Sequence, residues 1–91
     1  MPSAVRLSDV CTGHDSCPPR PNATASTDVF INARGAHRVG DRWQTHCSHD
    51  SNQASGSPNV FVNGRPQARV GDHIACGSNN ASGSPNVFVN G

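Results

Sequence analysis

The chain has 91 residues, a net charge of +1, 33% hydrophobic residues and 4% aromatic residues. A charge this close to neutral provides no basic face for nucleic acid or an anionic membrane surface, and no apolar run approaches the roughly 20 residues that span a bilayer. The apolar content is low for a small domain, which indicates that a metal, disulfides or a partner adds to the stability of the core.

The first segment, MPSAVRLSDV, lacks the apolar stretch and the cleavage pattern of a signal peptide. We therefore expect synthesis in the cytoplasm, where metal binding or free thiols are favoured over disulfides for the four cysteines. Residues Ala4–Asp9 of this segment match the second half of a unit that recurs in full downstream.

The complete unit occurs twice, with an offset of 31 residues. The first copy runs from Val29–Asn32 to Arg38–Asp41, and the second runs from Val60–Asn63 to Arg69–Asp72. In its second copy the unit joins a β-prone run, Val-Phe-Val, to a return strand, Ala-Arg-Val, through Asn-Gly, the strongest two-residue hairpin signal. No stretch shows helical periodicity, so each unit predicts a β-hairpin.

The last element, SPNVFVNG at Ser84–Gly91, repeats Ser57–Gly64 letter for letter. It is the first half of a third unit, whose second half is Ala4–Asp9 at the other end of the chain. Because the third unit is complete only if the two ends meet, the sequence predicts one all-β domain over residues 1–91, closed around a pseudo-threefold axis. A plain three-hairpin meander is the alternative.

Candidate metal ligands follow the closing aspartate of every unit, five residues after Asp9 and Asp41 and four residues after Asp72. Threefold closure brings these loops to one end of the axis, and a histidine three residues past the second ligand adds a fourth donor. The four candidates are His14, His46, His49 and Cys76. Three imidazoles and one thiolate form the closed tetrahedral shell of a structural zinc site. Iron accepts the same ligand types and is the less favoured metal.

A thiol-based arrangement is the open alternative, and it uses Cys11, Cys17, Cys47 and Cys76. These residues can bind zinc as thiolates or pair as two disulfides. A zinc enzyme needs an open coordination position, which four protein ligands argue against. We interpret His37 and His73 as surface imidazoles, because both are out of phase with the ligand positions.

The stretch SPNVFVNG, the following PQARVGD and the later Cys-Gly resemble the PAAR-repeat family, which is named after a Pro-Ala-Ala-Arg return strand. Gln67 replaces the first alanine, and Gly35-Ala36-His37-Arg38 departs further. CTGHDSCPPRPN and the segment with Trp43 are similar to a sub-type found among phage and bacterial members. The resemblance covers essentially the whole chain.

This resemblance implies a conical β-fold with a zinc ion near its point, held by His14, His46, His49 and Cys76. It also implies a structural role without enzymatic activity. The base would dock on the trimeric β-helical spike of a contractile injection machine (VgrG-like, or of a phage tail), with one chain per trimer. The point would lead in a transient passage through the target membrane. The chain would then be delivered outward as the tip of the apparatus or virion.

The repeated strands supply the apolar residues expected at the docking base, which are Val29, Phe30, Val60, Phe61, Val62, Val87, Phe88 and Val89. The alternative role that the resemblance implies is an adaptor that attaches effector cargo to the spike.

Overall fold

The structure, a computed structural model, describes residues 2–13, 18–46 and 49–89. Its strands form three two-stranded antiparallel sheets. β1 (Phe30–Ile31) pairs with β2 (Arg34–Gly35), β3 (Arg42–His46) with β4 (His49–Asn52), and β5 (Phe61–Val62) with β6 (Arg65–Pro66). The described part of the chain contains no helix, and therefore none that could cross a membrane. The predicted all-β class is confirmed.

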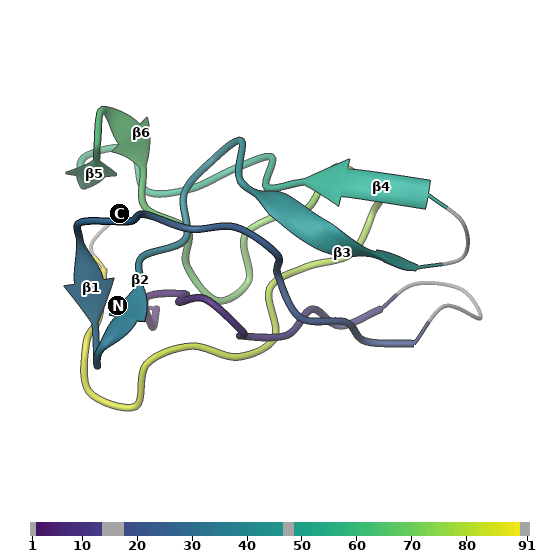
Figure 1. Cartoon of the computed structure of the whole chain (residues 1–91), viewed down its shortest axis with the longest axis horizontal. Helices are drawn as coiled ribbons and strands as arrows, with labels where there is room; N and C mark the ends of the chain where they lie inside the picture. Colours follow the sequence, from purple (N-terminus) through teal and green to yellow (C-terminus); the bar gives the residue numbers. More distant parts are fainter. Residues whose placement is uncertain (1, 14–17, 47–48, 90–91) are drawn as a thin grey trace.

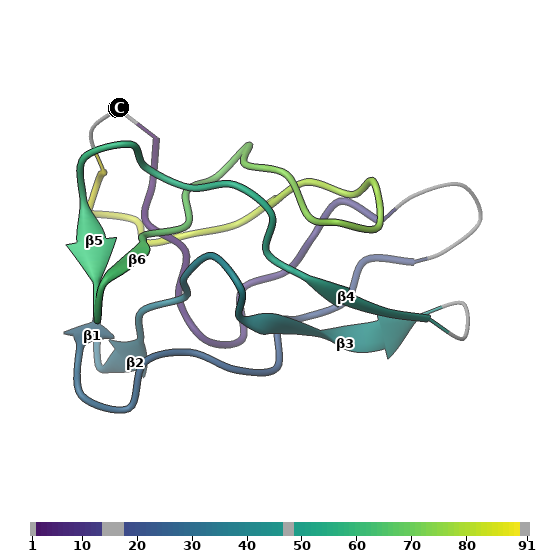
Figure 2. The same ribbon diagram turned by 90° about the horizontal axis from the view of Figure 1, so that it is seen from above.

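The sheets occupy two ends of an elongated molecule that measures 32 × 24 × 21 Å. Figures 1 and 2 show the β1–β2 and β5–β6 hairpins at one end, close to both chain termini, while the β3–β4 hairpin extends toward the other. We call the first the hairpin end (β1–β2, β5–β6 and residues 2–4 with 86–89). The second is the loop end (β3–β4 and the loops beside it).

The β1–β2 and β5–β6 hairpins turn through two residues that both have positive φ. Asn32 and Ala33 have φ of 53° and 66°, and Asn63 and Gly64 have φ of 54° and 77°. Positive φ at both central residues is the type I′ geometry whose twist matches that of the strands. Glycine adopts this conformation freely, whereas the Cβ of Ala33 makes it unfavourable. The predicted hairpins are confirmed, with one strained turn.

The two chain ends form the third hairpin together. Phe88 forms a bridge with Ser3, in the place that Phe30 takes opposite Gly35 in β1–β2. The Val89 N–H donates to the Pro2 carbonyl at 2.9 Å. The half-units at the two ends therefore complete each other, as the permuted repeat predicts.

A ring of three backbone hydrogen bonds closes the three repeats around the pseudo-threefold axis. The Val5 N–H donates to the Ala68 carbonyl (3.0 Å), the Ala68 N–H to His37 (2.9 Å), and the His37 N–H to Val5 (3.1 Å). All three residues are fully buried. Since a buried N–H without a partner costs about 1–3 kcal/mol, each repeat depends on its neighbour, and the pseudo-threefold closure is confirmed.

His37 is fully buried, so its interpretation as a surface imidazole is wrong. It stands at the ring position that Val5 and Ala68 take in the other repeats, so the pseudo-symmetry buries it at the axis. Its Nδ1–H donates to the Thr24 carbonyl at 2.9 Å, and burial lowers the pKa of the imidazole, which favours the neutral form. His73 is exposed, as predicted.

A small apolar cluster supports the loop end. Cys11, Trp43 and Ile74, one from each repeat, pack together, and the half-buried Cys76 packs against them. The Trp43 indole N–H donates to Gln53 Oε1 at 3.2 Å. The cluster contains only these few residues, so apolar packing makes a small contribution to the stability of the loop end.

Candidate docking base and metal centre

Every repeat contains an Arg-x-x-Asp turn that links the hairpin end to the loop end. In the first, Asp9 Oδ2 accepts the Arg6 backbone N–H at 2.7 Å and its Nε–H at 3.0 Å. The turns at Arg38 and Arg69 repeat these bonds with their own aspartates at 2.8–2.9 Å. Charged hydrogen bonds of this kind are stronger than neutral ones, so the turns hold the three repeats in one common geometry.

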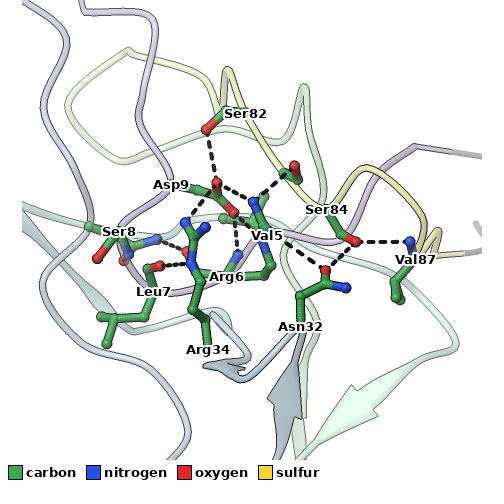
Figure 3. Close-up of polar contacts among 12 residues, drawn as sticks. Val5, Arg6, Leu7, Ser8, Asp9, Asn32, Arg34, Ser82, Ser84 and Val87 are labelled. Atoms are coloured by element: carbon green, nitrogen blue, oxygen red, sulfur yellow. Dashed lines mark hydrogen bonds and ion pairs between the residues drawn. The ribbon is translucent and has the colours of Figure 1, made fainter.

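A second arginine, from a neighbouring hairpin, reaches two of these carboxylates. Arg34 lies 3.3 Å from Asp9 Oδ1, and Arg65 lies 3.0 Å from Asp41 Oδ1. Figure 3 shows Arg6 and Arg34 converging on Asp9. Both arginines therefore tie a hairpin to the turn of another repeat.

These contacts set the charge state of Asp9 and Asp41. Burial alone would raise the pKa of each carboxyl, but hydrogen bonds from Arg6 and Arg38 outweigh it, so both pKa values lie below the ordinary range. Both groups are carboxylates at neutral pH.

The turn asparagines interlock the hairpins. Asn32 Oδ1 accepts the Ser84 hydroxyl at 2.6 Å, and the same hydroxyl accepts the Val87 N–H at 2.9 Å (Figure 3). Asn63 Oδ1 accepts the Ser26 hydroxyl at 2.7 Å in the same way. The tip of one hairpin therefore fixes the start of another, and the exposed side chains between them have defined positions.

Each hairpin exposes the same apolar pair. Phe30, Phe61 and Phe88 are 60%, 58% and 49% exposed. Their preceding valines, Val29, Val60 and Val87, are also exposed. Exposed apolar groups gathered on one region of a small protein are typical of an interaction surface. We call these six residues the docking base.

The side chains of Val62 and Val89, which the sequence analysis assigned to docking, face the interior. Val62 and Val89 are buried, because side chains alternate between the two faces of a strand and each follows an exposed phenylalanine. Their place is in the interior of the hairpin end, so the structure leaves six of the eight candidates available to a partner.

Of the expected metal ligands, Cys76 is the one whose side chain the structure describes. It is a free, half-buried thiol, and its backbone N–H donates to Ser51 Oγ of β4 at 3.0 Å. The backbones of His46 and His49 face each other at the end of the β3–β4 pair. These three positions therefore share the loop end. His14 and the side chains of His46 and His49 lie outside the described residues.

The donor types at the loop end fit zinc, because imidazole and thiolate are its preferred ligands. Among the side chains that the structure describes, which exclude those of residues 46–50, no three of histidine, cysteine, aspartate or glutamate group closely enough to hold a metal. Of the thiol alternative, Cys11 is a free, buried thiol, and Cys17 and Cys47 lie outside the described residues. The predicted ligand set stays a prediction.

Sequence reasoning missed the arginines and asparagines that fasten the hairpins. The signal was present, because an arginine follows the turn at the same offset in both complete units, at Arg34 and Arg65. A recurring charged residue opposite a recurring aspartate indicates an ion pair between repeats.

A family model described as the PAAR motif matches residues 10–82, which is most of the chain. The comparison with curated proteins found no match.

Proposed function

Because the chain belongs to the PAAR family, the structural spike-tip proteins of secretion and phage machinery, we propose that it caps the trimeric β-helical spike of a contractile injection machine. The observation that carries this proposal is the docking base, in which three equivalent hairpins each expose one Val-Phe pair. A trimer offers three equivalent surfaces, and a pseudo-threefold chain meets all three at once. One chain per trimer follows from this match.

Rigid hairpins suit this docking. The bonds from Asn32 and Asn63 to serines of other repeats order the exposed strands before a partner binds. Preorganisation of this kind lowers the entropy cost of association. Docking also covers backbone edges that would otherwise be open to pairing with other strands.

The loop end points away from the docking base (Figure 2) and leads during ejection. We assign its stability to a structural zinc ion held by His14, His46, His49 and Cys76. Bound zinc supplies a cross-link between loops that share only a small apolar cluster. The chain's own part is to bring β3–β4 and Cys76 together through the Ser51 hydrogen bond. In this role the chain is made in the cytoplasm and leaves as the tip of the particle.

Binding to the cognate spike trimer tests the docking base. The triple substitution Phe30→Asp, Phe61→Asp and Phe88→Asp places three charges on the surface that docking desolvates, so we expect complex formation to be lost in size-exclusion chromatography. Val10→Asp is the matched control, because Val10 is an exposed apolar residue outside the docking base. Unchanged binding by the triple variant would refute this assignment.

A further inference from the structure

The three closing aspartates have unequal numbers of arginine partners. Asp9 and Asp41 each bind the arginine of their own turn and a second one from a hairpin, which is Arg34 or Arg65. All seven arginines of the chain lie among the described residues. Within that part of the chain, Asp72 binds only the arginine of its own turn. The site at Asp72 therefore lacks one guanidinium that the other two contain; we number the repeats by their closing aspartates in chain order, so this is the third repeat.

A backbone carbonyl shows the same difference. The second arginine also donates its Nε–H to the carbonyl two residues before the aspartate, from Arg34 to Leu7 and from Arg65 to Val39, both at 2.9 Å. The equivalent carbonyl in the third repeat belongs to Val70, and no described residue donates a hydrogen bond to it. The Asp72 carboxylate and the Val70 carbonyl therefore lack the second guanidinium that binds both equivalent acceptors in the other repeats.

The space that the guanidinium would fill is open. A Cβ atom at Gly40 would lie 3.3 Å from Nη2 of Arg65, whereas a Cβ at the equivalent Gly71 would meet nothing within 4 Å. The side chain of Asp72 is 10% exposed, compared with 4% for Asp41. The arginine that covers the second site has no counterpart at the third.

The rest of the third site keeps the geometry of the other two. Asp72 accepts from Arg69 Nε at 2.8 Å and from Arg69 Nη2 at 2.9 Å. The Ser55 hydroxyl lies 3.4 Å from Asp72 Oδ1 and accepts the His73 N–H at 2.9 Å. In the second repeat the Thr24 hydroxyl has the same role, because it donates to Asp41 Oδ1 and accepts the Arg42 N–H. The site is therefore preformed, and its acceptors already have the required positions.

We propose that Asp72 Oδ1 and the Val70 carbonyl form a binding site for a guanidinium group, which takes an arginine side chain other than the seven in this sequence. The planar guanidinium can donate Nε–H to the carbonyl and Nη–H to the carboxylate together, as Arg65 does in the second repeat. An ammonium group lacks this fixed fork, so the site discriminates against lysine.

The third hairpin has Pro2 at the position of Arg34 and Arg65, because the Val89 N–H donates to the Pro2 carbonyl where Ile31 pairs with Arg34 and Val62 with Arg65. The proline ring carries no hydrogen-bond donor, so this position cannot fill the site. An arginine of a partner chain is therefore the source of the guanidinium.

A titration of the ¹⁵N-labelled chain with ethylguanidinium, followed by NMR, tests the site. We expect saturable shifts of the Gly71 and Asp72 amide signals and none at Gly40 and Asp41, where Arg65 already occupies the equivalent position. Ethylammonium should give much smaller shifts, and Asp72→Asn should abolish the response. Shifts that fail to saturate, or that appear equally in the second repeat, would overturn the proposal.

Two substitutions at Pro2 test whether the site accepts an arginine, Pro2→Arg and the control Pro2→Gln. If Pro2→Arg melts at a higher temperature than Pro2→Gln and no longer shows the ethylguanidinium shifts, the site binds a guanidinium in the geometry of Arg34 and Arg65. Equal melting temperatures, with ethylguanidinium shifts that persist in Pro2→Arg, would overturn the proposal, as would failure of ethylguanidinium to bind the original chain.

Discussion

The hairpin end and the loop end differ in how closely the three repeats match. At the hairpin end, all three pair in one register, and backbone hydrogen bonds run from each repeat to the next through Val5, His37 and Ala68. At the loop end, the one extended hairpin among the described residues is β3–β4, which follows Asp41, and the described segments beside it form isolated bridges.

This difference shows where the fold requires symmetry. A ring of hydrogen bonds between repeats closes only if every repeat has the same backbone geometry, so the hairpin end tolerates little divergence. Side-chain packing at the loop end accepts different residues, and Cys11, Trp43 and Ile74 together make one asymmetric cluster. The symmetric hairpin end is the one that we propose docks on a trimeric partner, and the asymmetric loop end is the one that we propose binds zinc.

Metal removal should separate the two ends most strongly. Chelation should lower the free energy of unfolding by several kcal/mol, because structural zinc contributes on the order of 10–16 kcal/mol in small metal-dependent domains. We expect amide hydrogen exchange to accelerate first in β3–β4 and last at the ring residues Val5 and Ala68. Equal acceleration at both ends would show that the ring depends on the metal as well. An unchanged melting temperature would rule out a structural metal.

The Asp41→Asn substitution should have the next largest effect. The carboxylate accepts hydrogen bonds from Arg38 and Arg65, so its loss should cost about 2–3 kcal/mol in urea denaturation. Asp72→Asn is the matched comparison and should cost less, since only Arg69 forms an ion pair with Asp72 among the described residues. An equal loss in both variants would show that the hairpin arginines contribute nothing to stability.

Close backbone contact between repeats predicts the effect of Gly56→Ala. A Cβ there would lie 2.8 Å from the Gln67 carbonyl oxygen, so the variant should lose about 1–3 kcal/mol of stability. Gly83→Ala should behave alike, because its Cβ would lie 2.7 Å from the Ala4 carbonyl oxygen. Thermal melts measure both, and a variant as stable as the original chain would mean that the repeats can move apart without cost.

Acid should weaken the hairpin end through Asp9 and Asp41. Their folded-state pKa values lie below the ordinary value of 3.8, so the stability they contribute is full above about pH 4 and is lost as the pH falls through the folded-state values. Urea midpoints between pH 6 and pH 2 measure this loss. The Asp41→Asn variant should show a shallower decline below pH 4, and a decline as steep as that of the original chain would contradict the prediction.

The smallest expected effect concerns the strained turn of β1–β2. Ala33→Gly should raise stability by about 0.5–1 kcal/mol, because Ala33 has a φ of 66° that glycine adopts without strain. Gly64→Ala makes the reverse change in the β5–β6 turn and should lower stability by a similar amount. The two melting temperatures should move in opposite directions, and movement in the same direction would remove turn strain as the cause.

The sequence was sufficient to predict the hairpin end, because its information is local and repeated. The Asn63-Gly64 turn, the 31-residue offset that carries it to Asn32-Ala33, and the permuted ends predict the hairpins and their closure. The burial of His37 was not predictable from spacing alone, since only the backbone ring reveals that this position lies on the axis. The second arginines also depend on contacts between repeats, which hairpin patterns do not describe.

The loop end was less predictable, because its residues do not repeat. Ligand candidates could be chosen from their distance to each closing aspartate, but that distance says nothing of the β3–β4 pairing or of the Cys11, Trp43 and Ile74 cluster. Cys76 beside this cluster is consistent with the expected site. The positions of the imidazoles depend on loop geometry that no local motif specifies.

The stoichiometry of the complex with the spike trimer tests the central claim most directly. Native mass spectrometry of the purified complex should give one chain for every three spike subunits, because the three hairpins of one chain occupy the three equivalent surfaces. Three chains per trimer, each docked through one hairpin, would contradict the account, as would the absence of a complex.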